Sequence, residues 1–591
     1  MYKRSLILAA LMLSLCFEQA AFAADQAAQT RKLSALLEQI WQYQLSADPI
    51  KATRYQNNRY NDKLKDLSPE ALKANVQRNQ QFLARLKEID DSELNHQQKI
   101  NKLMQMRELQ NDIDLYHYNA HYMPITSESG FYSSLAFLPA SAPFKTEQDY
   151  RNYLARLAEF PRYFDQQIAW MKKGIESGRV QPKSVLAGFD NTIKKFITDD
   201  VHDSQFFAPF KRLADSSFSS NVQASLYTQG ESAINQSVLP AYQRFYDFLV
   251  DQYIPNAKQD IAASTWQNGA EFYQNRSNYY TSTTLDVADI HQTGLQEVKR
   301  IRSEMQSVLD TLNFDGDINQ FIQHLRTSPE FYATSADELL MRASYIAKRI
   351  DATLPQLFYT LPRIPYGVAP VPDNIAPKYT TGRYIAPTRN DQPGYYWVNT
   401  YALDKRPLYA LPALTLHEAV PGHHLQISLA SEMQDLPPVR RYTYISAFGE
   451  GWGLYSEYLG KEVGIYTTPY EEFGRLSYEM WRACRLVVDT GMHMQVWSRQ
   501  KAIDYMLENT ALSEHNVTTE VDRYISWPAQ ALSYKIGELT IKRLRKKAED
   551  ALGDKFDLRA FHDAVLAYGS VPLSILEQNI DTFIEDNSKY K

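Results

Sequence analysis

The stretch Ala413–Gln426 constrains the fold more than any other part of this sequence. It reads ALTLHEAVPGHHLQ, so that three of the chain's 12 histidines fall within eight residues and Glu418 directly follows the first of them. A His-Glu pair followed one helical turn later by another His places two imidazoles on one helix face, where they can bind Zn²⁺ beside a general base. The stretch therefore predicts a metal-binding helix.

The spacing within this stretch leaves the second ligand open. Pro421 stands four residues after His417, and proline removes an N–H and clashes with the carbonyl four residues earlier, whereas Gly422 tolerates unusual dihedral angles. We therefore expect a bulge that absorbs both residues and brings His423 beside His417. On an undisturbed helix His424 would lie about 10 Å further along the axis, but it remains the rival ligand. The alternative is a kinked helix with solvated or hydrogen-bonded histidines.

A second acidic motif, SAFGEGWGLYSE over residues 446–457, supplies the candidate third ligand. Glu450 and Glu457 are seven residues apart, which is two turns on one face of a helix. A carboxylate from a second helix commonly completes a hydrolytic zinc site, so we predict Glu450 as a ligand and Glu457 as a residue that holds a ligand in place. Two solvated glutamates are the alternative, which the apolar neighbours Trp452 and Leu454 disfavour.

The helix expected around residues 481–493 carries further polar candidates. Arg482 or Arg485 could bind a substrate carboxylate through two parallel hydrogen bonds, or either could pair with a structural acid such as Asp489. His493 is a catalytic candidate, although a lone histidine is more often a hydrogen-bonded core residue.

The segment PAQALSYKIG, residues 528–537, opens another predicted helix. A tyrosine hydroxyl can stabilise the oxyanion of a tetrahedral intermediate, which makes Tyr534 a catalytic candidate. Lys535 is a candidate contact for an anionic substrate group.

The strongest strand pattern lies just before the metal-binding stretch. Prolines are frequent after Leu354, and between them Tyr395–Tyr401 is aromatic and β-branched. Such a strand could form an exposed edge that pairs with an extended peptide, with Tyr395 and Asn399 as substrate contacts. The alternative is an ordinary strand in a small sheet.

The first half of the chain has helical periodicity. Apolar residues from Leu33 to Trp41 form one stripe, Ser68-Pro69 marks a helix start, and further helices are expected around 94–118, 146–176, 232–252 and 286–310. The sequence shows no internal repeat or long linker. We therefore expect one unit over residues 24–591, with a helical half to about residue 350 and a metal-site half from about 351.

The N-terminus predicts export. Residues 1–23 combine Lys3 and Arg4, an apolar core and a small-residue cleavage site after Ala23, whereas Leu15 before Cys16 disfavours lipidation. Removing this segment changes the formal charge from −6 to −7, which argues against nucleic acid as a partner. The core is too short for stable membrane insertion. We predict a periplasmic or secreted protein.

The motifs HEAVPGHHLQ, EGWGLYSE and PAQALSYKIG in this order, with the helix that ends near His493, resemble the bacterial domain of unknown function 885 family. That family in turn resembles the gluzincin zinc peptidases typified by thimet oligopeptidase, angiotensin-converting enzyme and thermostable carboxypeptidase. The resemblance implies a mainly α, two-lobed metallopeptidase-like fold with a deep channel and a small β-sheet beside the zinc helix. It also implies His417, His423 and Glu450 as ligands, Glu418 as base and Tyr534 as a transition-state tyrosine.

These inferences predict an exported zinc metallohydrolase with one Zn²⁺ per chain, which cleaves short peptides with Glu418 as general base. One alternative is an amidase or isopeptidase that acts on cell-wall or γ-linked peptides. The other is a metal- or peptide-binding protein without turnover, which Glu418 disfavours because a structural site needs no base. The sequence determines neither the substrate, nor exo- or endo-cleavage, nor the oligomeric state.

Overall fold

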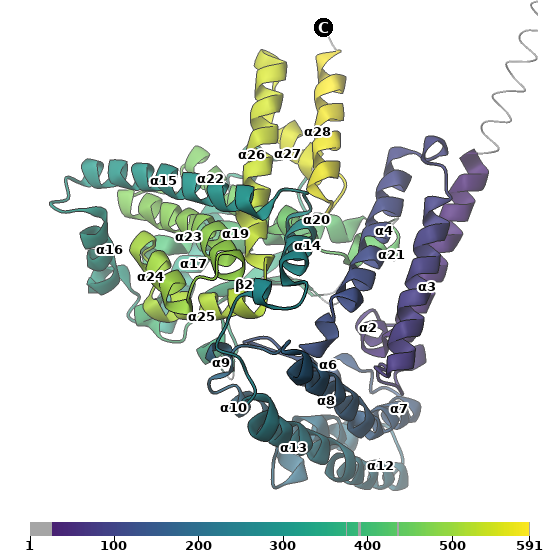
Figure 1. The fold of residues 1–591 in the computed structure, drawn as a ribbon. Coiled ribbons are helices and arrows are strands. Elements are labelled where there is room, and N and C mark those ends of the chain that lie inside the picture. Colours follow the sequence, from purple (N-terminus) through teal and green to yellow (C-terminus); the bar gives the residue numbers. More distant parts are fainter. Residues whose placement is uncertain (1–25, 374, 388–391, 434–435, 590–591) are drawn as a thin grey trace, which may run out of the picture. The chain divides into compact units, whose positions relative to one another are not determined.

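The computed structural model describes residues 26–589 except 374, 388–391 and 434–435, so the expected signal peptide lies outside the described residues. Helices make up most of the described chain, with one small sheet, which confirms the mainly α prediction (Figure 1). Across those described ranges, no helix combines the length and apolar character needed to span a lipid bilayer.

Contacts divide the chain into two compact units. Among the described residues, the first comprises those up to Lys258 together with Pro437–Val439, and the second comprises the others. The sequence instead suggested one unit whose helical half reaches to about residue 350, whereas the contacts separate two units after Lys258. Helices after Lys258 belong with the C-terminal part because the longest of them, α15 (Val287–Leu312), packs along α23 (Pro469–Met494).

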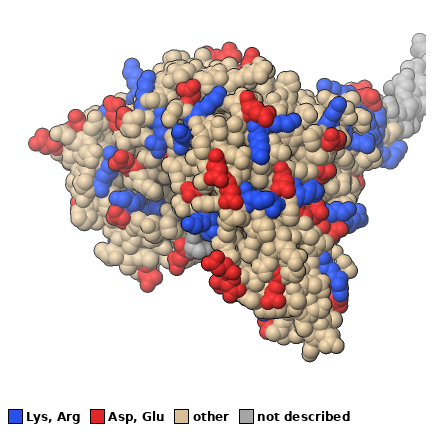
Figure 2. All heavy atoms as spheres, turned by 60° about the horizontal axis from the view of Figure 1, so that its bottom comes forward, with Lys and Arg blue, Asp and Glu red and all other residues tan. Residues whose placement is uncertain are grey.

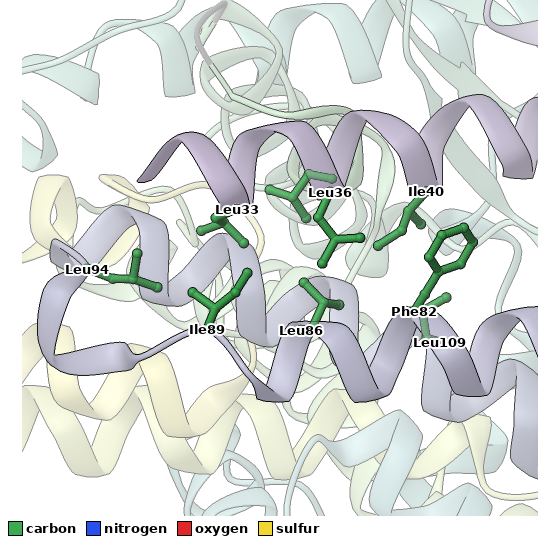
Figure 3. Close-up of a cluster of buried hydrophobic side chains, with 9 residues drawn as sticks. Leu33, Leu36, Ile40, Phe82, Leu86, Ile89, Leu94 and Leu109 are labelled. Carbon is green, nitrogen blue, oxygen red and sulfur yellow. The ribbon is translucent and has the colours of Figure 1, made fainter. Parts of the chain in front are cut away.

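The first unit consists of helices that follow the apolar stripes of the sequence. Its longer helices cover residues 26–47, α3 (Pro69–Lys87), α4 (His96–His117), α7 (Glu147–Ala158), α8 (Phe160–Ser177), α12 (Ser220–Ala233) and α13 (Leu239–Phe248). The Ser68 side chain accepts a hydrogen bond from Ala71 N at the predicted start of α3. In Figure 3, buried side chains of the first helix (Leu33, Leu36 and Ile40) point toward Phe82 and Leu86 of α3 and Leu109 of α4.

The second unit is built around α23, which is buried along most of its length. Besides α15, its other longer helices are α14 (Gly269–Thr281), α16 (Ile318–Thr327), α17 (Ala336–Asp351), α19 (Leu411–Glu418), α20 (His423–Glu432), α22 (Ser446–Glu462), α24 (Arg499–Asn509), α25 (Glu514–Ser526), α26 (Ser533–Leu552), α27 (Leu558–Leu566) and α28 (Leu573–Ser588). Helices α22 and α26 pack closely at Gly451 and Gly537. A Cβ on Gly451 would lie only 2.5 Å from the Cα of Gly537. Glycine at this crossing lets the two backbones approach.

The described sheet has three strands in the order β1-β3-β2: β1 (Tyr366–Pro370) runs parallel to β3 (Gly394–Val398), and β2 (Gly382–Ile385) runs antiparallel to it. Of the two alternatives for Tyr395–Tyr401, the structure agrees with an ordinary strand in a small sheet and not with an exposed edge, because β3 is the central strand. It ends early because the Asn399 side chain donates hydrogen bonds to the carbonyls of Ala376, Tyr379 and Thr380. The edge strand that contacts α19 is β2.

Candidate metal centre

The metal-binding stretch forms two helices separated by a short turn. Helix α19 ends at Glu418 and α20 begins at His423, so the expected bulge within one helix is replaced by a complete break. Gly422 N donates to the carbonyl of Leu416 at 3.0 Å, a wide turn that takes up the two extra residues. A Cβ on Gly422 would lie 1.9 Å from the His417 carbonyl oxygen, so only glycine fits this turn.

The break brings three potential ligand atoms together. His417 Nε2 and His423 Nε2 lie 3.6 and 3.4 Å from the same Oε2 atom of Glu450. Within the described ranges, these three residues form the one group whose donor atoms could hold a metal ion, with all of these atoms within 4.8 Å of one another. His424 is not part of it, because its Nδ1 lies 3.0 Å from the Tyr384 hydroxyl.

The spacing of these atoms fits zinc. Four ligands arranged tetrahedrally at bond lengths of about 2.0–2.1 Å stand roughly 3.4 Å apart, which matches the two distances to Glu450. Two imidazoles and one carboxylate also form a ligand set found in hydrolytic zinc sites, where the fourth position is left for water or substrate. The residues present therefore fit a zinc ion.

Helix α22 positions the centre from one side. Glu450 faces the two imidazoles, and two turns later Glu457 Oε1 lies 2.8 Å from His417 Nδ1 and 3.0 Å from a guanidinium nitrogen of Arg482. A Cβ on Gly453 would lie 2.7–2.8 Å from the His417 ring, so the missing side chain makes room for the imidazole. Glu457 thus holds His417 with Nε2 directed at Glu450.

Glu450 and His417 each shift the pKa of the other. Burial alone would raise the pKa of Glu450, but the imidazoles of His423 and His417 hold it well below its usual range. Burial alone would lower the pKa of His417, whereas hydrogen bonds with Glu450 and Glu457 raise it to about 9. These shifts favour the anionic form of Glu450, which is the form that binds a metal ion.

Glu418 directly follows His417 and its charge acts on that imidazole, but it is not part of the donor group. It is the last residue of α19, its side chain is buried, and its Oε2 accepts a hydrogen bond from Tyr384 N of β2 at 2.8 Å. A carboxylate next to a metal ligand, but outside the donor set, has the placement of a general base.

Two tyrosines flank the candidate ligands. The Tyr534 ring lies nearly parallel to that of His417, with centroids 6.4 Å apart, and the Tyr444 ring lies 6.5 Å from that of His423. Burial raises the pKa of the Tyr534 hydroxyl, and the negative charge of Glu450 adds to this effect. Sequence reasoning missed Tyr444, whose hydroxyl reaches over Gly449; the available signal was this glycine next to the predicted ligand.

The two arginines of α23 do not face the donor group as substrate contacts. Arg482 pairs with Glu457, while Arg485 donates to Glu520 and lies with its guanidinium carbon 4.1 Å from the Tyr534 ring centroid. Both side chains are buried. These ion pairs favour the structural alternative, although neither partner is the predicted Asp489.

Lys535 and His493 are also structural. Lys535 is fully buried, and its Nζ lies 2.6–2.9 Å from carboxylate oxygens of three glutamates: Glu297, Glu479 and Glu538. His493 is fully buried, with one ring nitrogen accepting from Ala263 N and the other within 3.0 Å of the Tyr524 carbonyl. Burial lowers the pKa of His493 to about 4. Neither side chain has a free polar atom for a substrate, so both site predictions are corrected.

The predicted peptide contacts on β3 are corrected for a different reason. Asn399 is buried, and its side chain is used to hold the preceding loop. Tyr395 is 39% exposed, but its backbone belongs to the central strand, which pairs with neighbours on both sides. An added peptide strand could therefore pair only at an edge of this sheet.

Comparison with known proteins gives a family without an assigned activity. A family model described as "Bacterial protein of unknown function (DUF885)" matches residues 49–580. None of the curated proteins matches the chain.

Two solved structures are similar over almost their whole length. A protein from Colwellia psychrerythraea, described as a candidate lipoprotein, matches with a TM-score of 0.85 and 29% sequence identity, covering 94% of this chain and 99% of its own. A candidate lipoprotein of unknown function from Shewanella oneidensis matches with a TM-score of 0.73 and 18% identity, covering 93% and 99%. At 18% identity the second match shows the fold alone.

Proposed function

We propose that this chain, which belongs to the bacterial DUF885 family of proteins of unknown function, is a zinc-dependent hydrolase of short peptides. One observation carries the proposal: His417, His423 and Glu450 bring three ligand atoms within 4.8 Å of one another, and Glu418, the residue after His417, is a buried side chain whose charge acts on that imidazole. A purely structural metal site has no need of the added base. The resemblance to gluzincin peptidases favours the same reaction.

The roles of the protein groups follow from their positions. When bound, zinc would supply Lewis acidity at the scissile carbonyl and at the attacking water. Glu418 takes the proton of that water and returns it to the leaving amine. The Tyr534 hydroxyl donates a hydrogen bond to the oxyanion, and Glu457 keeps the His417 ring in its ligating orientation.

The outer edge of β2 is the proposed site for the peptide backbone. Strand β2 pairs with β3 on one side, and on its other side Tyr384 N points to Glu418. A peptide that pairs with the rest of this edge, where the Tyr384 N–H is already bonded to Glu418, would therefore run past the base. This replaces the central strand that the sequence suggested for the same purpose.

The same proposal includes export. Residues 1–23 have the pattern of a signal peptide, and both structural neighbours are described as candidate lipoproteins. Figure 2 shows basic and acidic side chains interspersed over one face, which is not the single-sign surface expected of a nucleic-acid-binding protein. A peptide in the periplasm or medium is the proposed substrate.

Metal analysis tests the zinc site first. Purified protein of residues 24–591 should contain about one zinc per chain, and His417→Ala should lose most of it. The exposed His515 offers a matched control, because His515→Ala should keep the metal. Full zinc retention in His417→Ala would exclude the proposed centre.

A peptide panel then tests the reaction. The zinc-loaded protein should cleave members of a library of short α-linked peptides. Cleavage restricted to γ-linked or cell-wall-derived peptides would instead identify the amidase or isopeptidase alternative. Binding without cleavage across both sets would identify a non-catalytic metal or peptide carrier.

A further inference from the structure

His424 has a defined place although it is not among the candidate ligands. It lies in the first turn of α20, is 2% exposed, and its ring centroid is 4.7 Å from that of Tyr366 on β1 and 5.3 Å from that of Tyr384 on β2. His424 Nδ1 is 3.0 Å from the Tyr384 hydroxyl and 3.3 Å from Ser428 Oγ. The imidazole therefore links α20 to the edge strand.

Tyr384 connects this imidazole to the proposed base. Its hydroxyl bonds to His424, while its backbone N–H donates to Glu418 Oε2 at 2.8 Å. Because Glu418 ends α19 and His424 belongs to α20, one residue of β2 is bonded to both sides of the break between these helices.

The position of the Tyr384 ring is built into the sheet. A Cβ on Gly394 of β3 would lie 2.4 Å from the Tyr384 hydroxyl oxygen and 2.7–2.8 Å from its ring carbons. Glycine at this position lets the ring lie across β3 and reach His424. The contact between hydroxyl and imidazole is thus supported by packing as well as by the hydrogen bond.

We propose that His424 and Tyr384 are positioning residues, which fix β2 so that the Tyr384 N–H holds one oxygen of Glu418 and leaves the other directed at the reacting water. The proposal rests on the proposed function, because the orientation of Glu418 affects turnover only if Glu418 is the base. A glutamate side chain has several freely rotating bonds, so an anchor on one oxygen restricts the orientations of the other. Strand β2 needs such support, since it has four residues and sheet hydrogen bonds on one side.

Kinetics of single and double variants test this coupling. Tyr384→Phe and His424→Leu should each lower kcat roughly tenfold, as expected for a partner outside the ligand set, with KM changed less than about twofold and zinc retained. The double variant should be no slower than either single variant, because both remove the same bond. His424→Asn can place a polar atom where Nδ1 stands, so it should recover most of the lost kcat.

Tyr366 provides the matched control. Tyr366→Phe removes a hydroxyl from the same aromatic cluster, but that hydroxyl donates to Asp351 and not to His424. Its kcat should therefore stay within about twofold of the parent. Additive losses in the double variant, equal loss in Tyr366→Phe, or loss of zinc in Tyr384→Phe would each overturn the proposed coupling.

Amide hydrogen exchange gives a test that does not depend on activity. In the zinc-loaded full chain, the amide of residue 384 should exchange roughly tenfold faster in Tyr384→Phe than in the parent, because β2 is less firmly held. Unchanged exchange would overturn the positioning role. If the parent cleaves no peptide but the amide of residue 384 still exchanges faster in Tyr384→Phe, the result would contradict the proposed function while supporting the anchoring of Glu418 by β2.

Discussion

Two buried clusters of charged groups in the second unit differ in how their charges are satisfied. In the Lys535 cluster, one ammonium lies among Glu297, Glu479 and Glu538, whose carboxylate oxygens surround it at 2.6–2.9 Å. In the metal centre, the atoms of His417, His423 and Glu450 converge on one point instead.

The difference separates a structural ion cluster from a binding site. In the described part of the chain, the ion pairs of Glu450 are with the two imidazoles, which are themselves potential metal ligands. The carboxylates around Lys535 are neutralised by ammonium and guanidinium groups, which bind no metal. Burial of charge therefore marks both regions, but only convergent donor atoms beside an additional carboxylate indicate chemistry.

The largest contrast is expected between two adjacent histidines. His423→Ala should lose most of the bound zinc and with it the activity, whereas His424→Ala should keep the zinc because His424 bonds to Tyr384. Zinc per chain, measured by mass spectrometry on both purified variants, decides this. Zinc loss in His424→Ala with retention in His423→Ala would reverse the ligand assignment.

A substitution in the Lys535 cluster should lower the free energy of unfolding and leave the metal content unchanged. Lys535→Met leaves its glutamate partners buried without their shared cation, so the free energy of unfolding should fall by about 3–5 kcal/mol. Lys542→Met is the control, since Lys542 is 26% exposed and should lower the free energy of unfolding less. Denaturant titration measures both. A Lys535→Met protein of parental stability that has lost peptide cleavage would restore the substrate-binding assignment.

The stability of the protein in acid tests a second structural ion pair, that of Arg485 with Glu520. Burial alone would raise the pKa of Glu520, but the guanidinium groups of Arg523 and Arg485 hold it at about 2. The ordinary glutamate pKa in the unfolded chain is about 4.3, so this group stabilises the fold above that pH and loses its contribution as the pH falls toward 2.

The corresponding measurement compares parent and Glu520→Gln. The parent should lose up to about 3 kcal/mol more of its free energy of unfolding than the variant between pH 5 and pH 2. Denaturation curves at several pH values in this range test the difference. Parallel pH dependence in the two proteins would show that Arg485 is not engaged as described.

Substitution of Tyr534 should change the free energy of unfolding least among these variants. Tyr534→Phe keeps the ring over Arg485 but removes the hydroxyl, so stability should change little while kcat falls by about 10²-fold, with KM nearly unchanged. Steady-state kinetics on a cleaved peptide measure this. A raised KM at unchanged kcat would assign Tyr534 to substrate binding instead of the oxyanion.

Features that depend on local spacing were predictable. The cap at Ser68, the two-turn spacing of Glu450 and Glu457, and the need for Pro421-Gly422 to disturb the helix follow from backbone geometry within a few residues. The complete break between α19 and α20 goes further than the expected bulge, because Gly422 bonds to the carbonyl of Leu416.

Features that depend on distant partners were not predictable. Nothing near Lys535 in sequence indicates Glu297, and nothing near Glu418 indicates Tyr384 as its hydrogen-bond donor. The central position of β3 also depends on pairing with β1, which no local pattern specifies. The sequence therefore assigned Arg482, Arg485 and Lys535 to the substrate site, because their acidic partners are remote in sequence.

The most direct test of the account is Glu418→Gln. This variant keeps the size of the side chain and an acceptor for the Tyr384 N–H but removes the basicity. It should fold like the parent, retain about one zinc per chain and bind a cleavable peptide, while turnover falls at least ~10²-fold. Turnover equal to that of the parent, at equal zinc content, would contradict the assignment of Glu418 as the general base.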